Sequence, residues 1–182
     1  MYEPLGVALL ITPWNFPLST VIRKMIPALA CGNSIILKPS EFSSLTSIFL
    51  FELIDNISFP SGVANLILGE GRIIGSSLMD LSILKIISFT GSTETGELIQ
   101  KNIGSNDVRF QAEMGGANSL VIWEDAEIEK AIEATIASGM ACAGQWCTGI
   151  SKLVIHENIY DNVINLLVRA VKNINVGDGS LM

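Results

Sequence analysis

Two of the three cysteines lie close together in the segment SGMACAGQWCTGISK, residues 138–152. A cysteine there can be packing, a metal ligand, half of a disulfide or a nucleophile. Cys142 and Cys147 are five positions apart, without a second pair and with a single histidine in the chain, so zinc-ligand spacing is missing and no metal site is expected. Cys142 fits a buried position within an apolar helix, and Cys31, near a helix C-terminus, fits the same role. The Gly, Gln, Trp and Thr around Cys147 are not typical of a core element, so packing and nucleophilic chemistry both remain open for it.

Two other side chains could take part in catalysis. Glu113, in QAEMGG, is most simply a solvated residue at a strand end, but partial burial would raise its pKa and suit it to general base work. Asn15 lies in TPWNFP, where two prolines restrict the loop and could aim its amide at a ligand. The plainer interpretation of that loop is a proline turn with a buried Trp14.

Three further loops could bind a nucleotide. In KPSE, Lys38 and Glu41 could donate to and accept from the two hydroxyls of a ribose, or form an ordinary solvated ion pair. GEGRIIG (69–75) has glycines where a dinucleotide fingerprint belongs, but its spacing is G-x-G-x-x-x-G rather than G-x-G-x-x-G. FTGSTETG (89–96) opens a helix whose N–H groups suit an anion or a cofactor, although a Ser or Thr N-cap is the favoured interpretation of this motif taken alone.

Short apolar runs alternate with longer amphipathic ones along the chain. The runs predict strands at 6–11, 34–38, 63–68, 83–89, 119–123 and 152–156, and helices at 19–31, 44–57, 72–79, 93–103, 126–141 and 158–172. Apolar strands alternating with helices indicate an α/β fold with a parallel sheet covered on both faces. Ligands bind at the carboxyl ends of such strands, where the loops above are found. The glycines of EMGGAN (113–118) predict a joint between two layers.

Composition excludes some partners and suggests others. With 18 acidic and 11 basic residues and a formal net charge of −7, the surface should repel nucleic acid. No apolar run approaches the roughly 20 residues that cross a bilayer, and the N-terminus lacks the basic residues and cleavage site of a signal peptide. Three cysteines in a chain of 182 residues favour free thiols in a reducing, cytoplasmic compartment. A hydrophobic content of 49% predicts association through exposed apolar surface, as in a homo-oligomer.

The motifs TPWNFP, PALACGNSIILKPSE, FPSGVANLILGEG, FTGSTETG, EMGG and GQWCTG occur in one order along the chain. In that order and spacing, the sequence resembles the aldehyde dehydrogenase superfamily from about residue 4 to its C-terminus. The resemblance implies a doubly wound, mostly parallel, Rossmann-like sheet followed by the beginning of a second α/β domain. Residues 1–115 would form the dinucleotide-binding core, incomplete at its N-terminus, and residues 116–182 the first part of the catalytic domain.

The same resemblance implies a role for each catalytic candidate. Cys147 would attack an aldehyde as a thiolate and form a thiohemiacetal, which becomes a thioester after hydride transfer to a nicotinamide. Asn15 and the backbone N–H of Cys147 would form the oxyanion hole. Glu113 would activate the water that releases the carboxylic acid.

The resemblance also implies a cofactor cleft. Lys38 and Glu41 would hold the adenine ribose and Ser92 would lie near the pyrophosphate. The remaining cleft residues would be Thr12, Pro13, Trp14, Ser40, Gly71, Phe89, Thr90, Gly91, Met114 and Gly115. The Glu41 carboxylate would repel a 2′-phosphate, which favours NAD, although NADP is possible if that side chain turns away.

The sequence departs from full-length members in length and at three positions. Members are longer at both ends, and a Glu-x-Phe-Gly-Pro motif that holds the nicotinamide ribose is missing. Gly149 stands where alanine is usual, Lys152 where arginine is usual, and Met114 where leucine is common, while Asn15, Glu113, Gln145 and Cys147 match. The expected function is therefore NAD(P)-dependent oxidation of an aldehyde to an acid. The alternative is a non-catalytic, truncated remnant that acts as a nucleotide-binding or interaction module.

Overall fold

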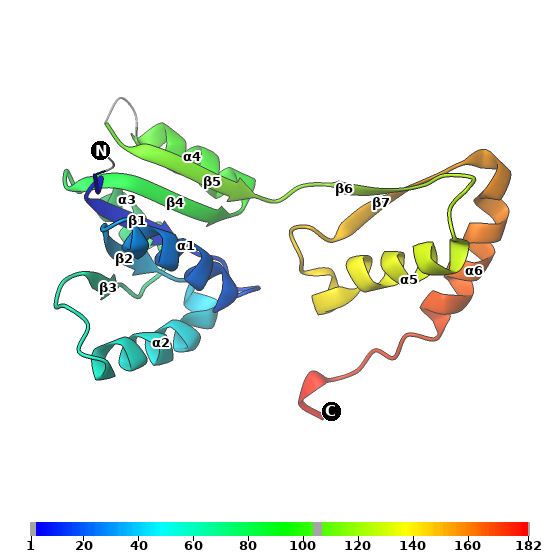
Figure 1. Ribbon diagram of the computed structural model, residues 1–182, viewed down its shortest axis with the longest axis horizontal. Coiled ribbons are helices and arrows are strands. Elements are labelled where there is room, and N and C mark those ends of the chain that lie inside the picture. The colour runs from blue at the N-terminus through cyan, green and yellow to red at the C-terminus, as the bar shows by residue number, and fades with distance from the viewer. Residues whose placement is uncertain (1–2, 104–106, 182) are drawn as a thin grey trace. The chain divides into compact units, whose positions relative to one another are not determined.

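The computed structural model describes residues 3–103 and 107–181 (Figure 1). The chain divides into two compact units, Met1–Gly115 and Gly116–Met182. The boundary lies within EMGGAN, the segment in which consecutive glycines predicted a joint. Each unit has a parallel sheet and a hydrophobic core of its own.

The first unit is built on a five-stranded parallel sheet in the order β3-β2-β1-β4-β5. Its strands are β1 Val7–Ile11, β2 Ser34–Lys38, β3 Ala64–Leu66, β4 Leu84–Gly91 and β5 Arg109–Met114. This strand order is that of a doubly wound Rossmann-type sheet, in which the chain crosses from one side of β1 to the other between β3 and β4. The predicted α/β fold class is confirmed.

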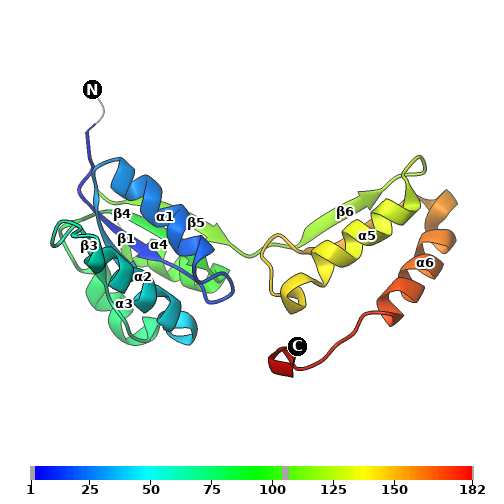
Figure 2. The same ribbon diagram turned by 60° about the horizontal axis from the view of Figure 1, so that its bottom comes forward.

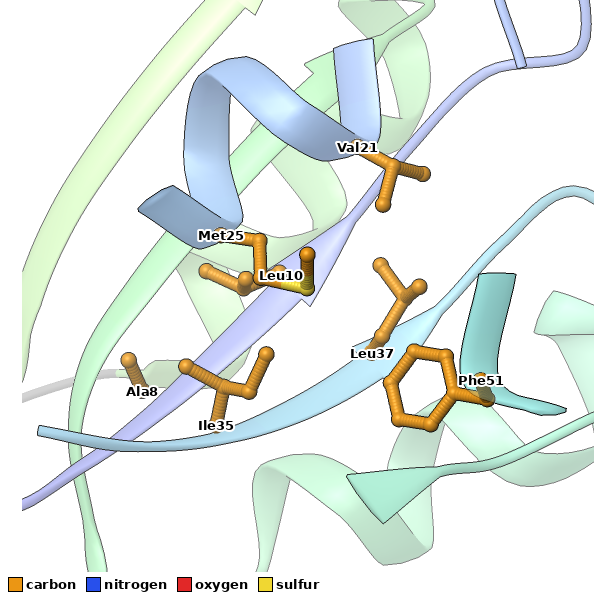
Figure 3. Packing of buried hydrophobic residues seen from close by; sticks show 7 residues of the cluster. All are labelled: Ala8, Leu10, Val21, Met25, Ile35, Leu37 and Phe51. Atoms are coloured by element: carbon orange, nitrogen blue, oxygen red, sulfur yellow. The ribbon is translucent and has the colours of Figure 1, made fainter. Parts of the chain in front are cut away.

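Two pairs of helices cover the two faces of this sheet (Figure 2). Helices α1 Ser19–Ala30 and α2 Ser44–Asn56 pack on one face, and α3 Gly71–Met79 and α4 Thr93–Ile103 on the other. Figure 3 shows the core beneath α1 and α2, formed by Ala8, Leu10, Val21, Met25, Ile35, Leu37 and Phe51. Alternate residues of β1 and β2 therefore enter different cores, as the two-residue period of a strand requires.

Asn33 ties the start of β1 to the end of α1. Its side-chain oxygen accepts hydrogen bonds from the backbone N–H groups of Leu5 at 2.9 Å and Gly6 at 3.1 Å, and its amide donates to the Ala28 carbonyl at 3.0 Å. The preceding residue, Gly32, has a φ of +78°, a left-handed conformation that ends the helix. The ACGN part of the sequence therefore has a structural role.

Asn33→Ala is expected to destabilise the chain by about 1–3 kcal/mol, because it removes the acceptor of two part-buried backbone donors, Leu5 and Gly6, while the Ala28 carbonyl keeps the backbone N–H of residue 33. Urea unfolding followed by circular dichroism measures this loss. Asn102→Ala, on the exposed face of α4, is the control and should stay within about 0.5 kcal/mol of wild type. Equal stability of the two variants would contradict the assignment.

The second unit pairs two parallel strands, β6 Asn118–Ile122 and β7 Ile150–Ile155, with two helices, α5 Ile128–Gly139 and α6 Tyr160–Lys172. Its core is centred on Ile122, Ile132 and Val163. Short 3-10 turns occupy Glu41–Ser43 in the first unit and Ala141–Gly144, Glu157–Ile159 and Gly179–Leu181 in the second. Within the described part of the chain, no helix combines the length and apolar character needed to cross a membrane.

The structure corrects the sequence-based expectation at two kinds of place. Strand β5 is absent from the predicted strands, although Glu113 was placed at a strand end. RFQAEM alternates polar and apolar residues, as a half-buried edge strand does, but it lacks the continuous apolar run by which the other strands were predicted. Cys142 does not lie in a buried helix. Helix α5 ends at Gly139, and Cys142 and Ala143 adopt left-handed conformations with φ of 52° and 55°, which turn the cysteine to solvent. Cys31, the residue that caps α1, is exposed as well.

Candidate active site

Every candidate residue of the first unit lies at the carboxyl edge of its sheet. The loop after β1 contains Thr12, Pro13, Trp14 and Asn15, and β2 ends at Lys38 and is followed by Ser40 and Glu41. Helix α3 begins at Gly71. Strand β4 ends with Phe89, Thr90 and Gly91 and is followed by Ser92, and β5 ends with Glu113 and Met114 and is followed by Gly115. All five strands are parallel, so these ends meet along one edge. That edge is where doubly wound sheets bind ligands.

A buried lysine lies beside a partly exposed carboxylate at this edge. The Lys38 side chain is 7% exposed and its Nζ lies 3.2 Å from Oε2 of Glu41, whose side chain is 38% exposed. A backbone N–H at Glu41 itself, and then the Lys38 ammonium, hold the pKa of the Glu41 carboxyl below its usual value against the cost of desolvation. A Cβ atom at position 71 would lie 3.5 Å from the Lys38 Nζ, so glycine keeps the space beside the ammonium open.

Several other cleft candidates make local contacts. The Ser40 hydroxyl accepts the N–H of Phe42 at 3.3 Å. The Ser92 hydroxyl accepts the N–H of Thr95 at 3.3 Å, so Ser92 caps α4 as the plainer interpretation of FTGSTETG required. Thr12 differs from both, because its Oγ1 is buried and has no hydrogen-bond partner within the described part of the chain. An unpaired buried hydroxyl at a ligand-binding edge is a place for a ligand atom.

Packing explains the pattern of glycines and large residues at the ends of β4 and β5. Phe89 is buried against α3 and α4. A Cβ atom at Gly91 would lie 2.5 Å from the Phe89 ring, and one at Gly96 would lie 2.5 Å from the sulfur of Met114. Phe89 and Met114 therefore fill the space that side chains at positions 91 and 96 would occupy.

Glu113 and Trp14 are more open than the sequence suggested. Glu113 is exposed in the first unit, so the partial burial that would suit it to base chemistry is not found there. Trp14 is 45% exposed, so the buried tryptophan of an ordinary proline turn is not found either. Asn15 is half-buried in the loop that leads into α1.

A hydrogen-bonded chain on the same face as Glu113 was missed from sequence. The Lys24 ammonium on α1 donates to the Ser88 hydroxyl at 2.8 Å, and Ser88 donates to Oε1 of Gln111 at 2.6 Å. Gln111 is two residues before Glu113 on β5, and therefore points to the same side of the sheet. One signal was available, because Lys24 lies three residues after the buried Val21 and hence on the core-facing side of its helix.

Burial changes the ionisation of Lys24. Desolvation lowers the pKa of its ammonium from 10.5 to about 8, and the charge of Glu113 opposes this shift. Below about pH 8 the group is charged in both the folded and the unfolded chain, and the folded chain bears the full cost of desolvation. Between about pH 8 and 10.5 the unfolded chain holds more protons, so stability rises with pH through this window.

Lys24→Met is expected to raise the free energy of unfolding at pH 7 and to flatten its rise between pH 8 and 10.5. Urea unfolding at a series of pH values measures both effects. Lys101→Met, at an exposed position of α4, should keep the wild-type rise. A variant at position 24 that retained the full pH dependence would show that another group causes it.

The candidate nucleophile lies in the second unit, in the turn between Ala141–Gly144 and β7. Cys147 is exposed, and the Gly149 N–H donates to the Trp146 carbonyl at 3.0 Å. Asn118, the first residue of β6, donates from Nδ2 to the carbonyl of Cys147 at 2.7 Å and of Gly149 at 3.1 Å. Sequence reasoning missed Asn118, because it is 29 residues away from the turn that it holds.

The structure thus gathers Asn15, Glu113 and the cleft residues at one edge of the first unit, whereas Cys147 belongs to the second unit. The grouping of Cys147 with Asn15 and Glu113 stays a prediction. Within the described ranges, no cluster of three or more His, Cys, Asp or Glu side chains could hold a metal ion.

A doubly wound parallel sheet in the order β3-β2-β1-β4-β5, with its candidate ligand-binding residues at the carboxyl edge, defines a Rossmann-type fold. The model of the aldehyde dehydrogenase family matches residues 1–181, and the chain belongs to that family.

Its relatives are several dehydrogenases of different aldehydes. The chain is 40% identical over 177 residues to betaine aldehyde dehydrogenase of Bacillus subtilis (strain 168), with 97% of this chain and 36% of the relative covered. It is 39% identical over 175 residues to D-glyceraldehyde dehydrogenase (NADP(+)) of Picrophilus torridus, with 96% and 36% covered. The crystal structure of betaine aldehyde dehydrogenase from Staphylococcus aureus in complex with NAD+ superimposes with a TM-score of 0.94 at 41% identity, covering 97% of this chain and 35% of that one. The chain thus spans little more than a third of the length of these relatives.

Proposed function

We propose that this chain carries the cofactor-binding core and the nucleophile segment of an NAD-dependent aldehyde dehydrogenase, which oxidises an aldehyde to a carboxylic acid through Cys147. The observation that carries the proposal is the buried Lys38 ammonium beside the Glu41 carboxylate and Gly71, at the edge where doubly wound sheets bind their ligands. In this assignment residues 1–115 are the dinucleotide-binding core and residues 116–182 the first part of the catalytic domain.

The residues at the edge fit a dinucleotide. Lys38 can donate to one ribose hydroxyl while Glu41 accepts from the other, and Gly71 leaves room for the sugar beside the ammonium. The buried hydroxyl of Thr12 has its hydrogen-bonding capacity unused and can serve the same ligand. Around them, Pro13, Trp14, Ser40, Phe89, Thr90, Gly91, Ser92, Met114 and Gly115 complete the proposed cleft.

The ionised Glu41 supports NAD over NADP. Its lowered pKa keeps the carboxylate charged at neutral pH, and a charged carboxylate repels a 2′-phosphate. The family contains both preferences, since one relative is named for NADP(+) and the Staphylococcus aureus structure holds NAD+. NADP would require the Glu41 side chain to turn away from Lys38.

Three residues of the chain would then carry out the chemistry. The Cys147 thiolate forms a bond to the carbonyl carbon, and the Asn15 amide with the Cys147 backbone N–H stabilises the oxygen that becomes negative. Bound NAD supplies the hydride acceptor. Glu113 removes a proton from the water that attacks the resulting thioester, which frees the acid and restores the thiol.

Incubation of the chain with NAD and a panel of aldehydes, followed by the absorbance of NADH, tests this function. Aldehyde-dependent NADH formation is the expected result. NAD binding by calorimetry without NADH formation would instead favour the alternative, a non-catalytic nucleotide-binding module. The absence of both binding and turnover would contradict the proposed function of this chain.

An apolar stripe supports self-association. Phe42, Leu45, Phe49, Leu53 and Ile57 lie three or four residues apart along α2 and its ends, and all are 63–84% exposed. Such a row forms one continuous face of a helix, and exposed apolar faces of this kind mark interaction sites. We infer a homo-oligomer, and the three unpaired cysteines support a reducing, cytoplasmic setting.

A further inference from the structure

We propose that Asn118 is a positioning residue for the Cys147 thiol, which it serves by fixing the backbone of the turn that carries the cysteine. The inference rests on the proposed function, because it concerns the same nucleophile. Its basis is the pair of hydrogen bonds from the Asn118 amide to the carbonyls of Cys147 and Gly149, at 2.7 and 3.1 Å.

The amide continues the pairing of two strands into the turn. In the β6–β7 ladder Asn118 is opposite Ile150, and the next pair is Ser119 with Lys152, so Ser151 is an extra residue at a bulge. The Ser151 hydroxyl donates to the Asn118 carbonyl at 3.3 Å, which closes this bulge. Backbone pairing between β6 and β7 thus begins at Ile150. Beyond it, the Asn118 side chain makes two hydrogen bonds to the residues that precede β7, at the carbonyls of Cys147 and Gly149.

The carboxamide of Asn118 suits both contacts. Its nitrogen carries two N–H donors, one for each carbonyl, whereas an aspartate of the same shape has no donor and would repel both oxygens. The shorter of the two bonds is to the carbonyl of Cys147 itself. Asn118 therefore holds the peptide group between Cys147 and Thr148 directly.

The turn is also confined from the other side. A Cβ atom at Gly149 would lie 3.0 Å from the Ser138 carbonyl and 3.1 Å from the Trp146 carbonyl, so the turn packs closely against the end of α5. Glycine at 149 permits this approach. Cys147 is exposed, yet the turn that carries it is confined between Asn118 and the end of α5.

Cys142 provides a contrast within the same segment. It is also exposed, but its carbonyl accepts from the Gln145 N–H at 3.0 Å, a local contact within its own turn. Fixing a reacting group before it meets its substrate removes an entropic cost from the chemical step, and small misplacements lower the rate steeply. Asn118 is thus expected to affect kcat rather than KM.

Two measurements on the full chain test this proposal with Asn118→Ala, its isostere Asn118→Asp and the donor-retaining Asn118→Gln. Hydrogen exchange by mass spectrometry should show at least about tenfold faster exchange in peptides covering residues 145–150 of the Ala and Asp variants, with α6 unchanged. Assays of NADH formation should show kcat lowered about 10- to 100-fold at unchanged KM for the aldehyde, and partial recovery in Asn118→Gln.

The two arms separate failure of the inference from failure of the proposed function. If residues 145–150 of the Ala and Asp variants exchange at the wild-type rate, Asn118 does not fix the turn and the proposal is overturned, whether or not the chain forms NADH. A wild-type chain that makes no NADH contradicts the proposed function, and exchange alone then decides the role of Asn118. Unchanged kcat in an active chain, or faster exchange spread over α6 as well, reduces Asn118 to an ordinary structural residue and overturns the proposal.

Discussion

Cys147→Ala is expected to abolish aldehyde-dependent NADH formation, whereas Cys142→Ala should keep activity within about twofold of wild type. Without the thiol no thiohemiacetal forms, and the hydride has no tetrahedral carbon to leave. Both cysteines are exposed in the same segment, so the pair is a matched test of which one is the nucleophile. The measurement is the rate of NADH absorbance with each purified variant.

Alkylation provides an independent check on the same assignment. Iodoacetamide should label Cys147 before Cys142 in the folded chain, and peptide mass spectrometry distinguishes the two sites. Preferential labelling of Cys142, or NADH formation that persists in Cys147→Ala, would show that the nucleophile has been assigned to the wrong residue.

Glu113→Gln is expected to slow the release of the acid by about 10²- to 10⁴-fold, because the amide keeps the shape of the side chain and cannot accept the proton of the attacking water. Formation of the thioester does not require this base. Rapid mixing should therefore show a burst of NADH equal to the concentration of active sites, followed by slow turnover. Intact-protein mass spectrometry should detect the acyl group on Cys147.

Glu97→Gln, on the exposed face of α4, is the matched control for the loss of one carboxylate. It should show no burst and a steady rate close to wild type. If Glu113→Gln behaved in the same way, the base would have to be sought elsewhere on the carboxyl edge of the sheet.

Local patterns in the sequence were sufficient to predict most of the fold. Strands β1 and β2 are continuous apolar runs bounded by turn residues, and helix α4 begins and ends at the predicted residues, 93 and 103. Strand β5 escaped because an edge strand has only one neighbour, and its polar side chains at 109, 111 and 113 face outward from the apolar core of α3 and α4. The prediction that Cys142 lies in a buried helix was wrong because a cysteine gives no indication of a left-handed backbone conformation.

In the candidate site, contacts within short motifs could likewise be predicted from the sequence, and contacts between distant segments could not. Residues in short motifs, such as Lys38 with Glu41, could be found from their spacing, since the partners are three residues apart. The residues that support the chemistry could not. Lys24 and Ser88 are 64 positions apart, Ser88 and Gln111 are 23 apart, and Asn118 and Cys147 are 29 apart. Such contacts exist only once the sheet has brought distant segments together.

The direction of the hydrogen bonds from Lys24 to Gln111 has a consequence for how the charge near Glu113 can vary. Ser88 gives its own proton to Gln111 and so can only accept from Lys24. An amine donates as an ammonium does, so Lys24 keeps this bond whether or not it is charged. As pH passes about 8, the positive charge beside Glu113 can therefore disappear while the side chain that carries it stays in place. The charge on Lys24 can thus change with pH while the position of its side chain does not.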